Sequence, residues 1–126
     1  MTTPRKIIAV IDDDPGVRSA LGRLLSAIGY PTETFGSAGE FLRAAPASNA
    51  ACIVVDVGLG NSSGLELVRQ LSVSGLRFPV IFISSAEDET IQRQAAELGC
   101  IAFLRKPFPA DRLVEAVKKA TGSTVQ

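Results

Sequence analysis

The sequence contains no histidine and no tryptophan, one tyrosine and one methionine. The absence of histidine excludes Ser-His and Cys-His nucleophile pairs, most zinc sites and phosphohistidine chemistry within this chain. Any chemistry must therefore rest on carboxylates, hydroxyls and lysine. A net charge of one sign is also missing, because 13 basic residues balance 13 acidic ones. We therefore expect no direct nucleic-acid partner, and any functional charge must lie in local clusters.

Cysteines are few, and long apolar runs are absent. Cys52 and Cys100 lie in no metal-ligand spacing, so we interpret them as small apolar side chains of a reduced, cytoplasmic protein. Residues 1–5 lack the apolar core of a signal peptide, and no apolar run approaches the length of a membrane span, so no membrane association is expected. The 126 residues, 46% of them hydrophobic, predict one domain over 1–126 with a core from about 5 to 121.

Five short apolar runs alternate with five helix-like stretches. Strands are predicted at 6–11, 31–35, 52–56, 78–83 and 101–104, and helices at 15–28, 38–45, 64–73, 87–98 and from about 109. The run at 31–35 alternates between polar and apolar residues, so we place it at a sheet edge. Strict alternation of strands and helices predicts a mostly parallel sheet with helices on both faces, in the α/β class.

Capping and periodicity signals set the helix limits. Asp14 before Pro15, Ser37 with Glu40, and Ser63 with Glu66 are N-terminal signals, whereas Gly29 and Gly99 follow helix ends. Residues 46–49 and the glycine- and serine-rich segment 58–64 are predicted as loops, and 122–126 as a frayed tail. The predicted inward-facing residues are Val17, Leu21, Leu24, Leu25 and Ile28 in the first helix, Ile91, Ala95 and Leu98 in the fourth, and Leu113, Val117 and Ala120 in the last.

Four of the five predicted strands end in residues that can do chemistry. The first runs into Asp12-Asp13-Asp14, the third stops at Asp56, the fourth ends at Ser84-Ser85, and the fifth leads into Arg105-Lys106. Ligands of open parallel sheets gather beyond the carboxyl ends of the strands, so these four features are expected at one edge. Clustered carboxylates repel one another, and Mg²⁺ with oxygen ligands is the usual remedy. A carboxylate can also attack phosphorus to give an acyl phosphate.

Each feature alone has an ordinary structural explanation. An acidic cluster before a helix often only caps it, and Asp14 keeps that role in our interpretation. A lone Asp56 at a strand end is commonly a turn residue, Ser84 a hydroxyl bonded to backbone, Lys106 a solvated charge and Phe103 a core residue. The combination at the correct strand ends is what favours a phosphoryl-transfer site.

The motifs together resemble one family. The stretches Val10-Ile11-Asp12-Asp13-Asp14-Pro15-Gly16-Val17-Arg18, Val54-Val55-Asp56, Ile83-Ser84-Ser85 and Lys106-Pro107-Phe108 are similar to those of response-regulator receiver domains of two-component systems. The resemblance covers essentially the whole chain. It implies a flavodoxin-like (βα)5 three-layer sandwich with a five-stranded parallel sheet in the order 2-1-3-4-5.

The resemblance also implies roles for individual residues. Asp56 takes the position of the phosphoacceptor, Asp13 that of a direct Mg²⁺ ligand and Asp12 that of an acid acting through water. Gly58 would offer its backbone carbonyl to the metal. Ser84 matches the switch hydroxyl, Lys106 the phosphate-pairing lysine and Phe103 the aromatic switch residue, and the Lys106-Pro107 bond is a candidate cis peptide.

The sequence departs from the family pattern beside Asp56. Gly58 lacks a side chain that often shields the phosphoryl group, Gly60 stands where many members have proline, and Ala86 is small. A more flexible loop over 57–63 and open access for water are therefore expected. We predict a phosphorylated form that is not exceptionally long-lived, and a half-life of many days would contradict this.

Three functions remain open at this point. The first is a phosphorylation switch that receives its phosphoryl group from a sensor histidine kinase or phosphotransfer protein and catalyses only its own phosphorylation and dephosphorylation. Its output surface is expected around residues 88–120, on the last two helices and the fifth strand, where family members often form homodimers. The second is an aspartyl-nucleophile phosphatase of the haloacid-dehalogenase type, although Gly58 stands where that class needs a second aspartate. The third is a pseudo-receiver that only binds protein.

Overall fold

The computed structural model describes residues 6–122, so the predictions for residues 1–5 and for most of the tail at 122–126 lie outside the described residues. One parallel sheet has the order β2-β1-β3-β6-β7. Its strands are Ile7–Ile11 (β1), Thr32–Phe35 (β2), Ala50–Asp56 (β3), Val80–Ser84 (β6) and Ala102–Arg105 (β7). Because β6 and β7 are the fourth and fifth strands of this sheet, the predicted order 2-1-3-4-5 is confirmed.

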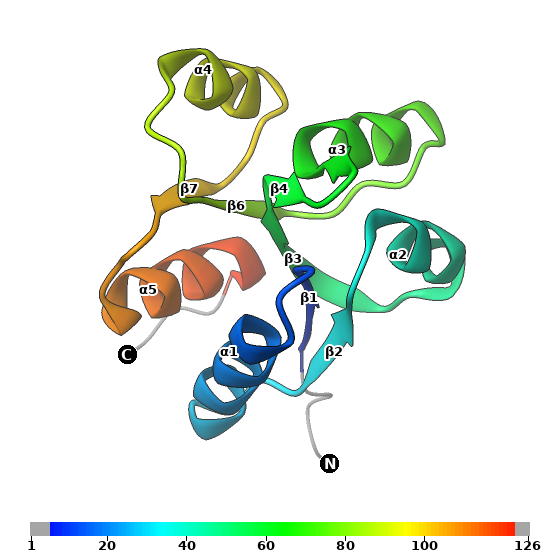
Figure 1. Cartoon of the computed structure of the whole chain (residues 1–126). Helices are drawn as coiled ribbons and strands as arrows, with labels where there is room; N and C mark the ends of the chain where they lie inside the picture. The colour runs from blue at the N-terminus through cyan, green and yellow to red at the C-terminus, as the bar shows by residue number, and fades with distance from the viewer. Residues whose placement is uncertain (1–5, 123–126) are drawn as a thin grey trace.

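Five α-helices cover the two faces of the sheet. They are Pro15–Ala27 (α1), Ala38–Ala44 (α2), Gly64–Val73 (α3), Glu89–Glu97 (α4) and Ala110–Thr121 (α5). Figure 1 shows α1 and α5 on one face and α2, α3 and α4 on the other, which is the three-layer arrangement expected from the sequence. None of these helices, within residues 6–122, has the length and apolar content that crossing a membrane requires.

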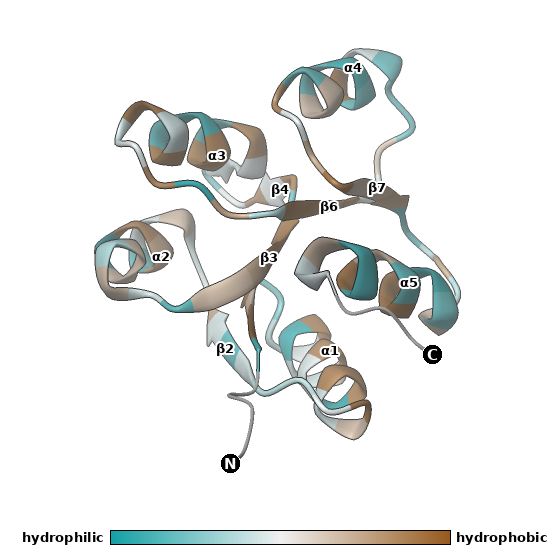
Figure 2. Cartoon of the chain, turned by 180° about the vertical axis from the view of Figure 1, so that it is seen from behind, coloured by the Kyte–Doolittle hydropathy of each residue, from teal (hydrophilic) through white to brown (hydrophobic). Residues whose placement is uncertain are grey.

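Side-chain alternation along the strands builds a separate core on each face of the sheet. Ala9, Ile53 and Phe82 point toward α2, α3 and α4, whereas their neighbours Val10, Val54 and Ile81 point toward α1 and α5. Strands buried on both faces read as continuous apolar runs. Figure 2 shows this as brown colouring along β3, β6 and β7, while the edge strand β2 is pale or teal. The edge position predicted for residues 31–35 is therefore confirmed.

The capping signals place the helix N-termini well. Asp14 accepts hydrogen bonds from the amides of Gly16 and Val17, and Ser37 accepts one from the Glu40 amide. Ser63 caps α3 through the Leu65 amide, but the Glu66 carboxylate pairs with Arg69 three residues later instead of returning to the cap. The cap predicted from Ser63 and Glu66 is therefore made by Ser63 alone.

Other predictions were wrong in detail. Ile28 was predicted in the inward stripe of α1, but it is 38% exposed because it stands at the C-cap and Gly29 then turns the chain with a φ of 99°. The predicted loop at 46–49 begins within a 3-10 turn, Ala45–Ala47. The predicted loop at 58–64 contains an antiparallel hairpin formed by Gly58–Leu59 (β4) and Ser62–Ser63 (β5). Helix α4 begins at Glu89 instead of residue 87, because Asp88 is its N-cap.

Candidate functional site

The carboxyl edge of the sheet gathers the polar residues that the sequence singled out. Asp12 and Asp13 follow β1, Asp56 ends β3, Ser84 ends β6 and Lys106 follows β7. Parallel strands end at one edge, and the register pairs Asp56 with Ile83 and Ser84 with Arg105, so the neighbouring strands stop at the same level. The predicted convergence of the acids and the lysine is therefore present.

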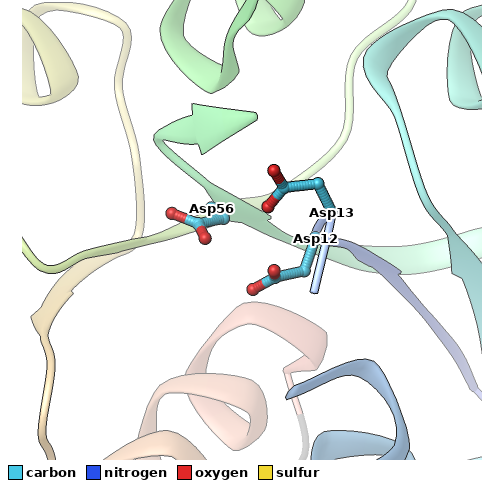
Figure 3. A group of neighbouring side chains, drawn as sticks. All are labelled: Asp12, Asp13 and Asp56. Carbon is cyan, nitrogen blue, oxygen red and sulfur yellow. The ribbon is translucent and has the colours of Figure 1, made fainter. Parts of the chain in front are cut away.

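Three carboxylates form the centre of the site. Each of Asp12, Asp13 and Asp56 offers an oxygen, and these oxygens lie within 4.8 Å of one another. Figure 3 shows the three side chains turned toward a common space, two from the end of β1 and one from the end of β3. Asp12 and Asp56 are buried, at 1% and 9% exposure, whereas Asp13 is exposed. The cluster is therefore open to solvent on the side of Asp13.

Asp12 is held on one side and unsatisfied on the other. Its Oδ1 accepts a hydrogen bond of 2.9 Å from the Asp14 amide. Its buried Oδ2 finds no hydrogen-bond partner in the described part of the chain. This oxygen lies 3.6 Å from the Lys106 ammonium, which is an ion-pair distance beyond hydrogen-bond reach. Burial, together with the nearby charge of Asp56, raises the pKa of Asp12, although the Asp14 amide and Lys106 act in the opposite direction.

Lys106 bonds directly to Asp56. Its Nζ donates to Asp56 Oδ2 at 3.1 Å, and Asp56 Oδ1 accepts from the Gly58 amide at 3.1 Å. Burial lowers the pKa of Lys106, but the bond to Asp56 and the charges of Asp56 and Asp12 outweigh it, so the pKa is raised. The lysine is therefore a fixed cation beside the least exposed pair of carboxylates.

The donor set fits a hard divalent cation. Mg²⁺ takes oxygen ligands and is commonly held by one or two carboxylates with water and phosphate oxygens completing its shell. The buried, unpartnered Oδ2 of Asp12 is an oxygen of this kind, and the three acids have only one lysine to balance them at this edge. The residues present therefore suit Mg²⁺. The Gly58 amide faces Asp56, and the role of the Gly58 carbonyl as a ligand stays a prediction.

The two predicted switch residues lie on the neighbouring strands, with Ser84 at the end of β6 and Phe103 within β7. The buried Ser84 hydroxyl accepts a 3.0 Å hydrogen bond from the Ala86 amide. Phe103 is half-buried on β7 opposite Phe82 and packs against the core beneath α4. Phe103 also lines a groove of about 650 Å³ between β7 and the start of α5. The switch roles predicted for Ser84 and Phe103 stay predictions.

Several residues that shape the site were not predicted from the sequence. A Cβ atom at Gly64 would lie 2.4 Å from the Asp56 carbonyl oxygen and 2.7 Å from Val55 Cγ1. Gly60, at the hairpin tip with a φ of 66°, lies beside Asp13, because its Cβ would be 3.5 Å from Asp13 Oδ2. Glycines in a serine-rich segment signal a turn, but the sequence does not tell which of them approaches a strand end.

An ion pair joins the segment after Ser84 to the end of β7. Arg105 Nη1 lies 2.8 Å from Glu87 Oε1, and Ser84 and Arg105 are partners in the strand register. Both side chains are largely exposed, so the pair contributes little to stability. The sequence placed Arg105 at a strand end but did not predict its partner.

The sheet order and the acids and lysine at its carboxyl edge together define a flavodoxin-like receiver fold. The family model for the response regulator receiver domain matches residues 8–118. The chain belongs to this family, and it is therefore a receiver domain of two-component response regulators, a class of signalling switches and not of classical enzymes.

Similar proteins of known sequence or structure support this family assignment. The transcriptional regulatory protein TdiR of Thauera aromatica is 39% identical over 113 residues, which cover 90% of this chain and 50% of TdiR. A crystal structure titled FIXJ-N matches with a TM-score of 0.87 and 29% identity, over 98% of this chain and 99% of that one. A response regulator receiver protein from Burkholderia phymatum has a TM-score of 0.82 and 34% identity, covering 96% and 98%. The chain spans about half the length of the curated relatives that it matches.

Proposed function

We propose that this receiver is a phosphorylation switch in which Asp56 accepts a phosphoryl group with the help of Mg²⁺. The observation that carries the proposal is the meeting of the carboxylate oxygens of Asp12, Asp13 and Asp56 within 4.8 Å, with Lys106 Nζ 3.1 Å from Asp56 Oδ2. A nucleophilic carboxylate, two further acids and a lysine are the parts that phosphoryl transfer to an aspartate requires.

Asp56 acts as the nucleophile in this proposal. A carboxylate oxygen forms a bond to phosphorus while the bond from phosphorus to the donor breaks, and the donor leaves with that electron pair. The product is an acyl phosphate on Asp56, carrying close to two negative charges. Bound Mg²⁺ would neutralise the equatorial phosphoryl oxygens and would be held by Asp13 and Asp56 directly, by the Gly58 carbonyl, and by Asp12 through water.

Lys106 would change its ion-pair partner when Asp56 is phosphorylated. In the unphosphorylated protein its Nζ bonds Asp56 Oδ2, an oxygen that loses its charge when it becomes part of an acyl phosphate. The ammonium then pairs with a phosphoryl oxygen, which carries the negative charge instead. Its raised pKa keeps it protonated across the physiological range, so it can serve in both pairings.

Ser84 and Phe103 would transmit the change. The Ser84 hydroxyl accepts a hydrogen bond from the Ala86 amide, so its own proton can be donated to a phosphoryl oxygen. Phe103 borders the groove between β7 and α5, so movement of the segment after Ser84 would alter the surface formed by α4, β7 and α5. We propose this surface as the output site and as the site of any homodimer.

The donor would be a sensor histidine kinase or a phosphotransfer protein. This assignment is supported by membership of the receiver family and by relatives described as transcriptional and response regulators. The 126 residues contain no histidine, so a phosphohistidine that donates to Asp56 would lie outside them. TdiR is named a transcriptional regulatory protein, and a transcriptional output for this receiver is part of the same proposal.

The test is direct phosphorylation. Wild-type protein incubated with acetyl phosphate and Mg²⁺ should gain the mass of one phosphoryl group, read by intact-mass spectrometry, whereas Asp56→Asn should gain none. EDTA should prevent the gain in the wild type. A phosphoryl group found on another aspartate, or equal labelling of Asp56→Asn, would contradict the proposal. Absence of any Mg²⁺ or phosphodonor response would support a pseudo-receiver instead, and steady turnover of a phosphomonoester a phosphatase.

A further inference from the structure

We propose that Arg18 is a positioning residue of the acidic site, which holds the Asp12–Asp13 peptide in the orientation that metal binding requires. This inference rests on the proposed function. Arg18 lies in the second turn of α1, and its Nη1 donates to the Asp12 carbonyl oxygen at 2.6 Å. The bond spans six residues and is not a helix bond, since it reaches back beyond the N-cap Asp14.

With the bond from Arg18, every polar atom of Asp12 but one has a hydrogen-bond partner among the described residues, and the remaining atom is available to a ligand. The Asp12 amide donates to the Phe35 carbonyl at 3.1 Å, and Asp12 Oδ1 accepts from the Asp14 amide at 2.9 Å. With the carbonyl held by Arg18, the buried Oδ2 is the one polar atom of Asp12 that has no hydrogen-bond partner within residues 6–122. Since the carbonyl of Asp12 belongs to the peptide that begins Asp13, fixing it also fixes the starting direction of Asp13.

The surroundings of Arg18 are shaped to keep it in place. A Cβ atom at Gly36 would lie 3.2 Å from Arg18 Nη1 and 3.0 Å from Glu40 Oε2. Glu40 in turn accepts the Gly36 amide at 2.9 Å. The absence of a side chain at Gly36 therefore gives the guanidinium room to reach the end of β1. Arg23, five residues further along α1, is exposed, and its Nη1 donates to the Ser19 hydroxyl at 3.4 Å.

The positioning role and a simple charge effect predict opposite results. Replacing Arg18 by alanine removes a positive charge near a cation site, so electrostatics alone would strengthen Mg²⁺ binding. If Arg18 orients the ligands, its loss weakens binding, and residues that orient metal ligands typically change metal affinity by about tenfold or more. The sign of the change therefore distinguishes the two explanations.

The experiment is calorimetric titration of magnesium chloride into the unphosphorylated full chain. We expect Arg18→Ala to raise the Mg²⁺ dissociation constant by about tenfold. Arg18→Lys, which keeps a charged donor, should recover most of the affinity. Arg23→Ala is the matched control on the same helix and should bind as the wild type does. Gly36→Ala keeps the arginine but crowds Nη1, so it should show a smaller loss in the same direction.

Each outcome bears on a particular claim. Unchanged or tighter binding in Arg18→Ala, or an equal loss in Arg23→Ala, would overturn the role of Arg18 while leaving the proposed function intact. No Mg²⁺ binding by the wild type would contradict the proposed function itself, and the role of Arg18 would fall with it. Urea unfolding checks that each variant is folded. If Arg18→Ala is not, wild-type affinity in Gly36→Ala, which crowds Arg18 Nη1 and keeps the arginine, would overturn the inference.

Discussion

Gly64 lies where a side chain has no room. It begins α3, and its amide donates to the Val57 carbonyl at 2.8 Å, which closes the segment that follows β3. A Cβ atom there would meet the backbone oxygen of Asp56 at 2.4 Å, and backbone cannot move aside as a flexible side chain can. We expect Gly64→Ala to lower the free energy of unfolding by about 1 to 3 kcal/mol, the range of overpacking, measured by urea unfolding.

Gly58 provides the matched control. A Cβ atom at Gly58 meets nothing within 4 Å, and the residue is exposed. Gly58→Ala should therefore change the free energy of unfolding by no more than about 0.5 kcal/mol. Equal losses in the two variants would show that the effect at Gly64 does not come from contact with Asp56.

Cys52 should make stability depend on pH in the alkaline range. Burial raises the pKa of its thiol to about 12, whereas the unfolded chain has a value near 9. The neutral thiol is favoured in the folded state, so this contribution is complete below pH 9 and is lost as pH rises from 9 through 12. At pH 10 the loss from this residue is about 1.4 kcal/mol, because the unfolded state alone has released the proton.

Comparison with Cys52→Ala isolates this effect. Lysines and tyrosine also titrate at alkaline pH, so the quantity to measure is the difference in unfolding free energy between wild type and variant at pH 7.5 and pH 10. That difference should shrink by about 1.4 kcal/mol at the higher pH. A constant difference would mean that the thiol is ionised equally in both states.

At the scale of residues, the sequence was sufficient to predict those site residues that lie at the ends of strands. Asp12, Asp13, Asp56 and Lys106 meet because parallel strands end together, and this follows from the order of elements alone. The contacts of Arg18 with Asp12 could not be predicted in this way. They depend on the path of a loop and on the missing side chain of Gly36, which no periodicity encodes.

Among the helices, α2 depends on a single side-chain cap. The Ser37 hydroxyl accepts from the Glu40 amide at 3.1 Å, and the helix is only seven residues long, so its unpaired amides are a large share of its backbone. We expect Ser37→Ala to lower the free energy of unfolding by about 1 kcal/mol. Urea unfolding measures this, and Mg²⁺ binding should be unchanged because the Ser37 hydroxyl bonds to Glu40 and not to the three acids.

Ser72 serves as the comparison for Ser37. It is exposed within α3 and away from the N-terminus of that helix. Because alanine is the better helix former, Ser72→Ala should leave stability unchanged or raise it by a few tenths of a kcal/mol, about the difference in propensity. A loss of unfolding free energy as large as that of Ser37→Ala would show that the capping hydrogen bond of Ser37 does not account for the effect.

At the scale of elements, sequence patterns located all ten main strands and helices and missed the small ones. The hairpin β4–β5 has strands of two residues each, too short for any alternation to be read. The error at Ile28 has a different cause. Helical spacing predicts that Ile28 faces inward. The helix ends at Ala27, however, so Ile28 is the C-cap and its side chain faces outward.

For the molecule as a whole, bound Mg²⁺ should raise thermal stability. Ligands that bind only the folded state stabilise it, and a Mg²⁺ concentration ten times the dissociation constant adds about 1.4 kcal/mol, or roughly 5 °C in melting temperature. The gain arises because the cation relieves repulsion among Asp12, Asp13 and Asp56. Differential scanning calorimetry with and without magnesium chloride measures it.

Asp13→Asn should abolish most of this gain. Asp13 is exposed and contributes one of the three oxygens, so its replacement removes a ligand without leaving a buried charge unpaired. Asp111→Asn, an exposed acid in the first turn of α5, should retain the full response to Mg²⁺. A wild-type response that survives in Asp13→Asn would place the cation elsewhere.

The whole-molecule architecture was predictable in two stages. Alternating strands and helices predict a parallel sheet covered on both faces, and this holds for residues 6–122. The order of the strands does not follow from alternation, since several orders satisfy it, and it came from the resemblance of four motifs to receiver domains. Burial of Ala9 and Val10 on opposite faces then fixes the register of β1.

The bond between Gly64 and Val57 has a practical use. It joins the two ends of the hairpin segment at their base, so we expect changes at the hairpin tip to leave β3 undisturbed. Loop tips of this kind accept inserted residues at small entropic cost. A dye or short tag inserted between Gly60 and Asn61 would lie beside Asp13 without disturbing the sheet. It would report binding of a cation at the three carboxylates as an optical signal.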